Sequence, residues 1–304
     1  MIIGVDHGFG YIKTVHSSFV AGVTPFGVEP PLKNNVLKYD GKYYVLGGER
    51  QGVQRSKVDN EDYYLMTLGA IAEELEYRKV TEANVILGAG LPLTRFGIEK
   101  AEFKQYLMQN SEVAFEYEGI HYKVKISDVR LFPQGYSSII KDMDKLLDGE
   151  DEVLLVDIGS WTIDILPIVN GIPNMAACKS ELNGIIKVLN SINEEVNREL
   201  GAGVSEMKIQ TIMQGKSCKI PTQFLEIIEN GIRRYAKKLM DRLKEEYEIA
   251  TTPLIFVGGG SCVIKNFYEY NDEMTTMITD FAANAKGYEY LVLDQERKRK
   301  EARG

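Results

Sequence analysis

The chain contains very little cysteine, histidine or tryptophan: three cysteines, three histidines and one tryptophan in 304 residues. Cys178, Cys218 and Cys262 are widely separated, and none forms a Cys-x-x-Cys pair or has a histidine at ligand spacing. This pattern argues against a zinc site, and the odd cysteine count argues against a disulfide framework. We therefore expect three reduced thiols in a cytoplasmic protein.

Long hydrophobic runs are also missing. No stretch approaches the roughly 18 apolar residues that a membrane-spanning helix needs. The first ten residues, MIIGVDHGFG, have no basic region followed by an apolar stretch and a cleavage site of small residues. The sequence therefore predicts no membrane association and no signal peptide.

Positive charge is scarce, because the formal net charge is -8. Proteins that hold DNA directly usually show a basic balance or a clear basic patch. The one basic cluster here lies within residues 297–303, next to the acidic residues Glu296 and Glu301. We interpret it as a solvated helix end, where cations also suit the helix dipole, and expect no direct contact with nucleic acid.

The pattern of strands and turns occurs twice along the chain. Residues 1–20 and 153–177 each show an apolar strand, an Asp-x-Gly turn and two further strands, and helices follow later in both cases. Such a repeat predicts two related α/β domains. We expect the first domain to span residues 1–150, with a C-terminal helix over 281–304 packing back on it, and the second to span 151–280.

Three dipeptides between β-rich runs predict hairpin turns, since Asp-Gly and Asn-Gly favour tight two-residue connections. They are Asp40-Gly41, Glu118-Gly119 and Asn170-Gly171. The segment DNEDYYLMTLGAIAEELEYR, residues 59–78, instead has the apolar spacing of an amphipathic helix.

The first candidate site is VDHGFGYIK, where a tight turn follows the first strand. Gly8 and Gly10 allow close approach of an anion to backbone N–H groups. Asp6, at the strand end, has the carboxylate that can hold a hydrated divalent cation, and Lys13 can reach toward a phosphate. Taken alone, this segment also fits an ordinary glycine-containing hairpin turn.

The second candidate site, VDIGSWTID, repeats the Asp-x-Gly turn about 150 residues later. Asp157 can join the first carboxylate in positioning a metal's waters. Gly159, Ser160 and Trp161 can offer backbone N–H groups to a terminal phosphate, and Thr162 adds a second hydroxyl to that of Ser160. Two such turns in duplicated surroundings are much harder to explain as ordinary turns than one.

Two further segments complete the candidate set. LIFVGGGS runs from an apolar strand into Gly258, Gly259 and Gly260, where a flat base or a phosphate can lie against the backbone. LFPQGYSS places Gln134 after another apolar strand. Its amide can both donate and accept hydrogen bonds, so it can orient an attacking water, although a simple turn residue is the alternative.

Taken in order, these segments resemble the superfamily of actin, sugar kinases and heat-shock-chaperone ATPases. The resemblance implies an α/β fold of two duplicated actin-like (ribonuclease H-like) domains with a nucleotide cleft between them. It identifies the two Asp-x-Gly segments as the phosphate loops and Phe132–Gly135 as the first interdomain connector. Gly258–Ser261 is then similar to the adenosine motif, and Phe281–Tyr288 to the second connector.

Within the superfamily the sequence looks most like the ParM/StbA group of plasmid segregation proteins. GVDHGFGYIK, GAGLPLTRFG (residues 88–97) and ANAKGY near the end carry this resemblance. One departure is Ser160-Trp161-Thr162, where many relatives have Gly-Thr-Thr. The backbone N–H donors of the loop survive this change, because any residue except proline supplies them.

The resemblance implies an ATPase that forms head-to-tail filaments, whose hydrolysis drives disassembly and which moves plasmid DNA through a DNA-bound adaptor of the ParR type. It implies ATP as substrate, with GTP as the alternative, and Mg²⁺ held through water by Asp6 and Asp157. Asp157 and Gln134 are the implied catalytic residues. Adenosine contacts are expected from helical residues 230–246.

Three alternatives use the same fold. A small-molecule kinase needs a general base, usually Asp, where this connector has Gln134. A chaperone needs a substrate-binding domain, for which the 44 residues after Gly260 leave no room. Another actin-like cytoskeletal protein would keep the filament but carry no plasmid.

Overall fold

The computed structural model describes residues 1–50, 52, 56–147 and 149–302. The chain forms two compact units, Met1–Asp142 with Phe281–Gly304, and Met143–Asp280. The division thus falls at residue 142 instead of the expected residue 150. The short helix α4 (Met143–Leu147) accounts for the difference, because Leu147 packs against the turn at Gly171 in the second unit.

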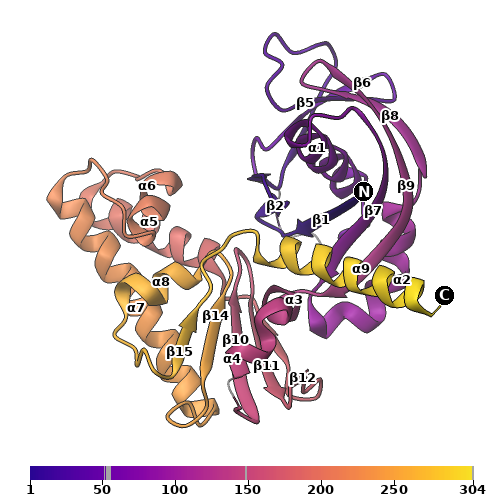
Figure 1. The fold of residues 1–304 in the computed structure, drawn as a ribbon. Coiled ribbons are helices and arrows are strands. Elements are labelled where there is room, and N and C mark those ends of the chain that lie inside the picture. Colours follow the sequence, from indigo (N-terminus) through magenta and orange to yellow (C-terminus); the bar gives the residue numbers. More distant parts are fainter. Residues whose placement is uncertain (51, 53–55, 148, 303–304) are drawn as a thin grey trace. The chain divides into compact units, whose positions relative to one another are not determined.

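The first unit is built on a nine-stranded sheet in the order β3-β2-β1-β7-β9-β8-β5-β6-β4. Its strands are β1 (Ile2–His7), β2 (Tyr11–Lys13), β3 (Ser18–Val20), β4 (Val23–Phe26), β5 (Val36–Tyr39), β6 (Lys42–Leu46), β7 (Glu82–Leu91), β8 (Glu112–Tyr117) and β9 (Ile120–Pro133). Strands β1, β7 and β9 run parallel to one another, and the other pairs are antiparallel. Figure 1 shows helix α1 (Asp62–Tyr77) inside the curve of this sheet.

Helix α1 forms the centre of the first core, and its sequence explains why. Its first three turns are apolar on nearly every side, so that all residues from Tyr63 to Ala72 are buried. A helix that is apolar all round must be enclosed. Helix α2 (Leu93–Leu107) is mostly exposed by comparison and contributes Phe103 and Leu107 to the same core.

The three predicted hairpin turns are confirmed. Each connects paired antiparallel strands through two residues that both have positive φ. This is the turn type whose twist matches that of the flanking strands. The six φ angles are 48° at Asp40, 72° at Gly41, 53° at Glu118, 85° at Gly119, 50° at Asn170 and 75° at Gly171.

The second unit repeats the local plan of the first. Its sheet has the order β12-β11-β10-β14-β15, with β13 paired to β11. The strands are β10 (Glu152–Ile158), β11 (Ile163–Val169), β12 (Ile172–Pro173), β13 (Lys179–Glu181), β14 (Leu254–Val257) and β15 (Thr275–Met277). Strand β10 pairs antiparallel with the strand that follows its glycine turn and parallel with β14, as β1 does with β2 and β7. The predicted duplication is therefore confirmed.

Helices α5 (Ile185–Leu200), α6 (Glu206–Met213), α7 (Thr222–Glu246) and α8 (Ser261–Phe267) complete the second unit. Buried residues of all four join those of β10, β11 and β14 in one core. The apolar face of α5 recurs at helical spacing, at Ile186, Leu189, Val196 and neighbouring positions. The other faces of α5 carry polar and charged residues, which is the pattern of an amphipathic helix.

Helix α9 (Ala283–Glu301) packs on β1 and β7 of the first unit at very close range. A Cβ atom added at Gly4 would lie 2.1 Å from the Ala285 carbonyl oxygen, and one at Gly88 would lie 2.9 Å from Tyr288 Cβ. Only glycine permits such backbone contact. Tyr288 itself stacks on Phe132 of β9, with ring centroids 6.2 Å apart.

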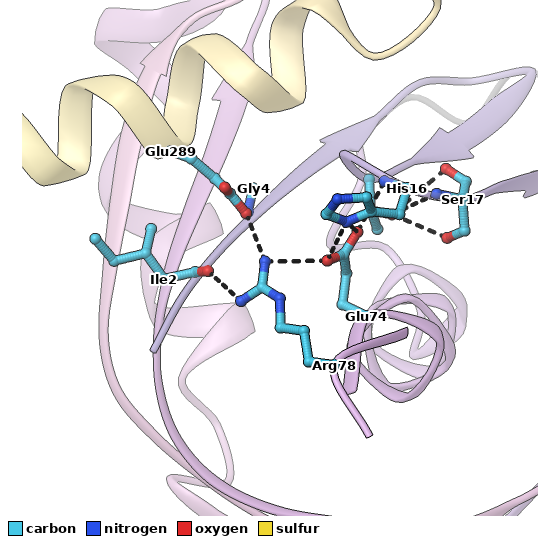
Figure 2. A network of polar contacts seen from close by, with 8 residues as sticks. Ile2, Gly4, His16, Ser17, Glu74, Arg78 and Glu289 are labelled. Carbon is cyan, nitrogen blue, oxygen red and sulfur yellow. Dashed lines mark hydrogen bonds and ion pairs between the residues drawn. The ribbon is translucent and has the colours of Figure 1, made fainter. Parts of the chain in front are cut away.

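Arg78, which directly follows α1, links α9 to β1 through hydrogen bonds (Figure 2). Its guanidinium donates to the Ile2 carbonyl oxygen at 2.8 Å and to Glu289 Oε1 at 3.1 Å. The same Glu289 oxygen accepts the Gly4 N–H at 3.1 Å. Burial raises the pKa of Glu289, and the bonds from Gly4 and Arg78 act against that shift.

Glu74 forms the other half of this network (Figure 2). Its carboxylate is fully buried, accepts from Arg78 at 3.0 Å and receives the backbone N–H of His16 at 2.9 Å. The His16 ring also contacts it, at 3.0 Å, and stacks on Tyr77. Burial tends to raise the pKa of Glu74, but hydrogen bonds from Thr14 and His16 and the charge of Arg78 outweigh burial and lower it.

Within the described residues, no helix combines the length and the apolar character needed to cross a bilayer.

Replacing Glu74 by Gln should lower the free energy of unfolding by about 2 kcal/mol, because Arg78 and His16 then lose a buried charged acceptor. The folded-state pKa of Glu74 lies below its ordinary value of 4.5, so its charge stabilises the protein above that pH. That stabilisation is lost as the pH falls below 4.5. Calorimetric melting midpoints should thus differ between wild type and Glu74→Gln at pH 7 and converge in acid.

A matched control is Glu112→Gln, since Glu112 pairs with Lys125 at the exposed surface. This change should leave the midpoint nearly unaltered at either pH. The stabilising charge assigned to Glu74 would be contradicted if the difference in melting midpoint between wild type and Glu74→Gln stayed constant from pH 7 to pH 4.

Candidate functional site

The predicted site residues of the first unit lie at one edge of its sheet. Strands β1, β7 and β9 are parallel, with Val5, Ala89 and Leu131 in register. Asp6 follows one residue later on β1, and Gln134 follows β9. The carboxyl ends of parallel strands meet at one sheet edge, where α/β proteins commonly bind ligands.

Asp6 is buried, with only 2% of its surface exposed, and it faces Lys13 across the β1–β2 pair. The distance between Asp6 Oδ2 and Lys13 Nζ is 3.8 Å. Among the described residues, Asp6 Oδ1 has no hydrogen-bond partner. A buried carboxylate oxygen without a partner is costly, so this atom fits a site for water or a hydrated cation.

The turn after Asp6 is stabilised by its own backbone. Gly8 N–H donates to the Asp6 carbonyl oxygen at 3.1 Å, and the Gly10 carbonyl accepts from Ala21 at 3.0 Å. A Cβ atom at Gly8 would lie 2.7 Å from the Tyr11 carbonyl oxygen. The turn is therefore too tight for a larger residue at Gly8.

Lys57, which was not singled out from the sequence, lies beneath this turn. Only 3% of its surface is exposed. Its ammonium group lies over three aromatic rings, with distances to the ring centroids of 5.4 Å for Phe9, 5.7 Å for Phe103 and 6.0 Å for Tyr63. Such contacts stabilise a buried cation. No local sequence pattern indicates them, because the three aromatic residues come from three separate segments.

His7, at the end of β1, is a packed histidine and not a solvent-facing one. It is fully buried, and its Nε2 lies 2.8 Å from Thr67 Oγ1 on α1. Burial and the charge of Lys57 lower the pKa of His7 to about 3. The ring is therefore neutral at physiological pH and helps to fix the strand end that carries Asp6.

Gln134 is half-buried where β9 ends. Its N–H donates to the Leu91 carbonyl oxygen at 2.8 Å, which extends the β7–β9 pairing by one residue. The structure thus brings Asp6, Lys13 and Gln134 to the same edge of one sheet.

In the second unit, Asp157 and the glycine triplet likewise lie at the carboxyl ends of neighbouring parallel strands. Asp157, at the end of β10, is in register with Val257 on the parallel strand β14, and Gly258 follows. A Cβ atom at Gly258 would lie 2.3 Å from Asp157 Oδ1, and the φ angle of Gly258 is 84°. Both the close contact and the backbone angle require glycine there.

The loop between β10 and β11 is bonded to the start of α5. Carbonyl oxygens of Gly159, Ser160 and Trp161 accept N–H groups from residues 184–186 at 2.9–3.2 Å. The Gly159 N–H donates within the loop, to the Thr162 carbonyl at 2.9 Å, so it is not directed outward as expected. The Thr162 hydroxyl likewise contacts Asp164 Oδ2 at 3.2 Å.

The other two glycines of the triplet differ from each other. A Cβ atom at Gly259 would meet nothing within 4 Å, so this residue borders open space. Gly260 N–H donates to the Ile158 carbonyl at 2.9 Å, and a Cβ atom there would clash with Ile158 and Ile185. Gly259 is therefore the position at which a ligand can approach, whereas Gly260 is needed for packing.

The proposed adenosine segment 230–246 lies within α7. Arg233 and Lys237 form i,i+4 ion pairs with Glu229 and Asp241 on the exposed surface. Tyr235 is better placed to affect the loop between β10 and β11, because its hydroxyl donates to the Asn183 carbonyl at 2.9 Å, next to the bonds that hold this loop. The sequence alone did not distinguish Tyr235 from its neighbours.

Within the described residues, no three His, Cys, Asp or Glu side chains group together to hold a metal ion. Each unit has one buried aspartate at its strand end: Asp6, with a side-chain oxygen that has no partner among the described residues, and Asp157.

Two family models match the chain. The model for the N-terminal domain of actin-like proteins matches residues 4–136. The model for the C-terminal domain of MreB-like archaeal actin homologues matches residues 155–269. A search of curated proteins found no significant match.

Solved structures of actin homologues share the fold. The archaeal actin homologue Ta0583 in complex with ADP has a TM-score of 0.73 and 21% identity, covering 96% of this chain and 99% of its own. ParM of Bacillus thuringiensis with ATP has a TM-score of 0.68 and 15% identity, covering 96% and 98%. ParM from a 15-stranded Clostridium botulinum filament has a TM-score of 0.72 and 16% identity, covering 95% and 98%. The predicted actin-like fold is confirmed, and this chain belongs to the actin-like proteins.

Proposed function

We propose that this chain binds Mg²⁺-ATP through its two Asp-x-Gly loops, hydrolyses it and assembles into filaments whose disassembly follows hydrolysis. The main observation in favour is that Asp6 and Asp157 occupy equivalent positions, each buried at the end of a strand that pairs parallel with one neighbour and antiparallel with the next. Structural relatives solved with ADP and with ATP support a nucleotide as ligand. GTP remains the alternative nucleotide.

In the first unit, Asp6 would hold Mg²⁺ through water with its unpartnered oxygen. When bound, Mg²⁺ neutralises charge on the phosphate oxygens. Lys13, whose ammonium group is 3.8 Å from Asp6, would add positive charge for the β- and γ-phosphates. Gln134 would orient the attacking water with its side-chain amide, which both donates and accepts.

In the second unit, Asp157 would share in holding the metal's waters and in orienting the nucleophile. The loop carbonyls are directed toward α5, so the N–H groups of Ser160 and Trp161 are the donors proposed for the terminal phosphate. Gly258 and Gly259 would lie against the nucleotide. Positioning and charge stabilisation account for most of the catalysis in reactions of this type.

We further propose plasmid segregation through a DNA-bound adaptor of the ParR type as the biological role. The sequence resemblance to ParM and the ParM filaments among the structural relatives favour it. The net charge of -8 is consistent with a protein that moves DNA without touching it.

A second candidate role is a cytoskeletal filament unrelated to plasmids. The match to the archaeal MreB-like C-terminal domain and the likeness to archaeal Ta0583 favour it. Co-sedimentation of filaments with a plasmid that carries the adaptor's binding site, in the presence and in the absence of the adaptor protein, separates the two roles.

Right-angle light scattering after addition of Mg²⁺-ATP should show a lag, a rise and then a fall that follows phosphate release. Asp157→Ala should give filaments that persist, because assembly would continue while hydrolysis is lost. Gln134→Ala should lower the turnover number for phosphate release about 100-fold, as expected for loss of a group that positions the water. The same measurements are made with Mg²⁺-GTP and with a non-hydrolysable ATP analogue.

Phosphate release without scattering at any protein concentration would rule out the filament. Hydroxyl-bearing small molecules would then be screened as phosphate acceptors, which is the test for a kinase. Absence of both signals would rule out the ATPase.

Trp161, the only tryptophan, lies in the proposed phosphate loop, and its ring nitrogen is buried without a hydrogen-bond partner among the described residues. Its fluorescence should therefore change on titration with ATP and Mg²⁺. Asp6→Asn should shift the magnesium concentration at half-signal upward by about tenfold, since one carboxylate charge is lost. Lys33→Gln, a surface change in the same unit, is the control and should not alter the titration.

A wild-type fluorescence that stays constant under saturating ATP and Mg²⁺ would contradict the placement of this loop against the phosphates.

A further inference from the structure

The turn that carries Gln134 has an unusual backbone. Tyr136 N–H donates to the Gln134 carbonyl oxygen at 2.9 Å, which closes a three-residue turn. The central Gly135 has φ 75° and ψ -64°. These are the angles of the γ-turn with positive φ, the rarer of its two forms, which glycine can adopt because it has no Cβ atom.

Most bonds that hold this turn come from its immediate neighbours. Gly135 O accepts from the backbone N–H of Ser138 at 3.0 Å and from its hydroxyl at 2.5 Å. The Ser137 hydroxyl donates to the Pro133 carbonyl at 2.6 Å. These contacts form within one short stretch of chain and leave the Gly135 N–H to be satisfied from elsewhere.

Asn284 satisfies it. Its side-chain oxygen accepts the Gly135 N–H at 3.0 Å, in a buried position 149 residues away along the chain. Asn284 is only 8% exposed and is the second residue of α9. The helix cannot easily shift, because a Cβ atom at Gly287 would lie 1.9 Å from the Ser137 carbonyl oxygen.

We infer that Asn284 is a positioning residue for ATP hydrolysis: it holds the γ-turn at Gly135 and thereby fixes the direction of the Gln134 side chain. This inference rests on the proposed ATPase function. Asn284 acts through the backbone of the turn and not on the nucleotide, so it should affect the turnover number more than the affinity for ATP.

Asn284→Ala should lower the turnover number for phosphate release at least tenfold and leave the KM for ATP within twofold of wild type. Asn284→Asp keeps an acceptor oxygen and should recover most of the activity. Asn193→Ala is the matched control, because the Asn193 side chain also accepts a backbone N–H, from Val204 at 2.9 Å, but in the second unit. It should leave the turnover number unchanged.

A double-mutant cycle separates positioning from a general loss of structure. In a Gln134→Ala background, Asn284→Ala should reduce the remaining activity less than twofold, because there is no longer a glutamine to position. An equal reduction in both backgrounds would overturn the inference. A change in the KM for ATP with no change in the turnover number would also overturn the inference.

Amide hydrogen exchange of the peptide covering residues 132–138 gives a readout that does not depend on activity. This peptide should exchange at least tenfold faster in Asn284→Ala than in wild type or Asn284→Asp. Equal exchange would overturn the inference even if ATP is hydrolysed. If wild type hydrolyses no ATP, the proposed function fails, and the exchange rates alone then decide whether Asn284 holds the turn.

Discussion

The backbone of helix α9 lies directly against β1, β7 and the turn after β9, and the arrangement of the first unit depends on this contact. Glycine at positions 4, 88 and 287 makes it sterically allowed, and Gly90 leaves room for the Tyr288 side chain. The contact brings a segment from the end of the chain beside the strand that carries Asp6 and the turn that carries Gln134. Two side chains of α9, Glu289 and Asn284, then bond to the backbone of these two elements.

Charge is used differently at the two ends of β1. At its start, one guanidinium, that of Arg78, is shared by the buried Glu74 and the partly exposed Glu289, and His16 and the backbone supply further donors. At its end, Asp6 keeps an oxygen without a partner among the described residues. The first arrangement stabilises the fold, whereas the second leaves binding capacity for a ligand. An unsatisfied buried group of this kind calls for an explanation, and a ligand site is one.

Much of the fold was predictable because it depends on local patterns. Glycine after Asp40, Glu118 and Asn170 predicts hairpin turns, and apolar runs before Asp6 and Asp157 predict buried strands. The repeated Asp-x-Gly layout correctly predicted two related units. The domain boundary was misplaced by eight residues because nothing in the sequence shows that α4 packs against the turn at Gly171.

The sequence by itself determined the family, the duplicated fold and the short segments proposed to bind nucleotide, because their glycine and aspartate residues are close together along the chain. Only the tertiary structure decided which of those groups are available: the Gly159 N–H is used within its loop, whereas Asp6 Oδ1 has no partner among the described residues. It also showed Lys57 among three aromatic rings and Asn284 on the Gly135 turn. Except for Lys57 with Tyr63, these contacts join residues 46 to 149 positions apart, and long-range packing leaves no periodic pattern in a single sequence.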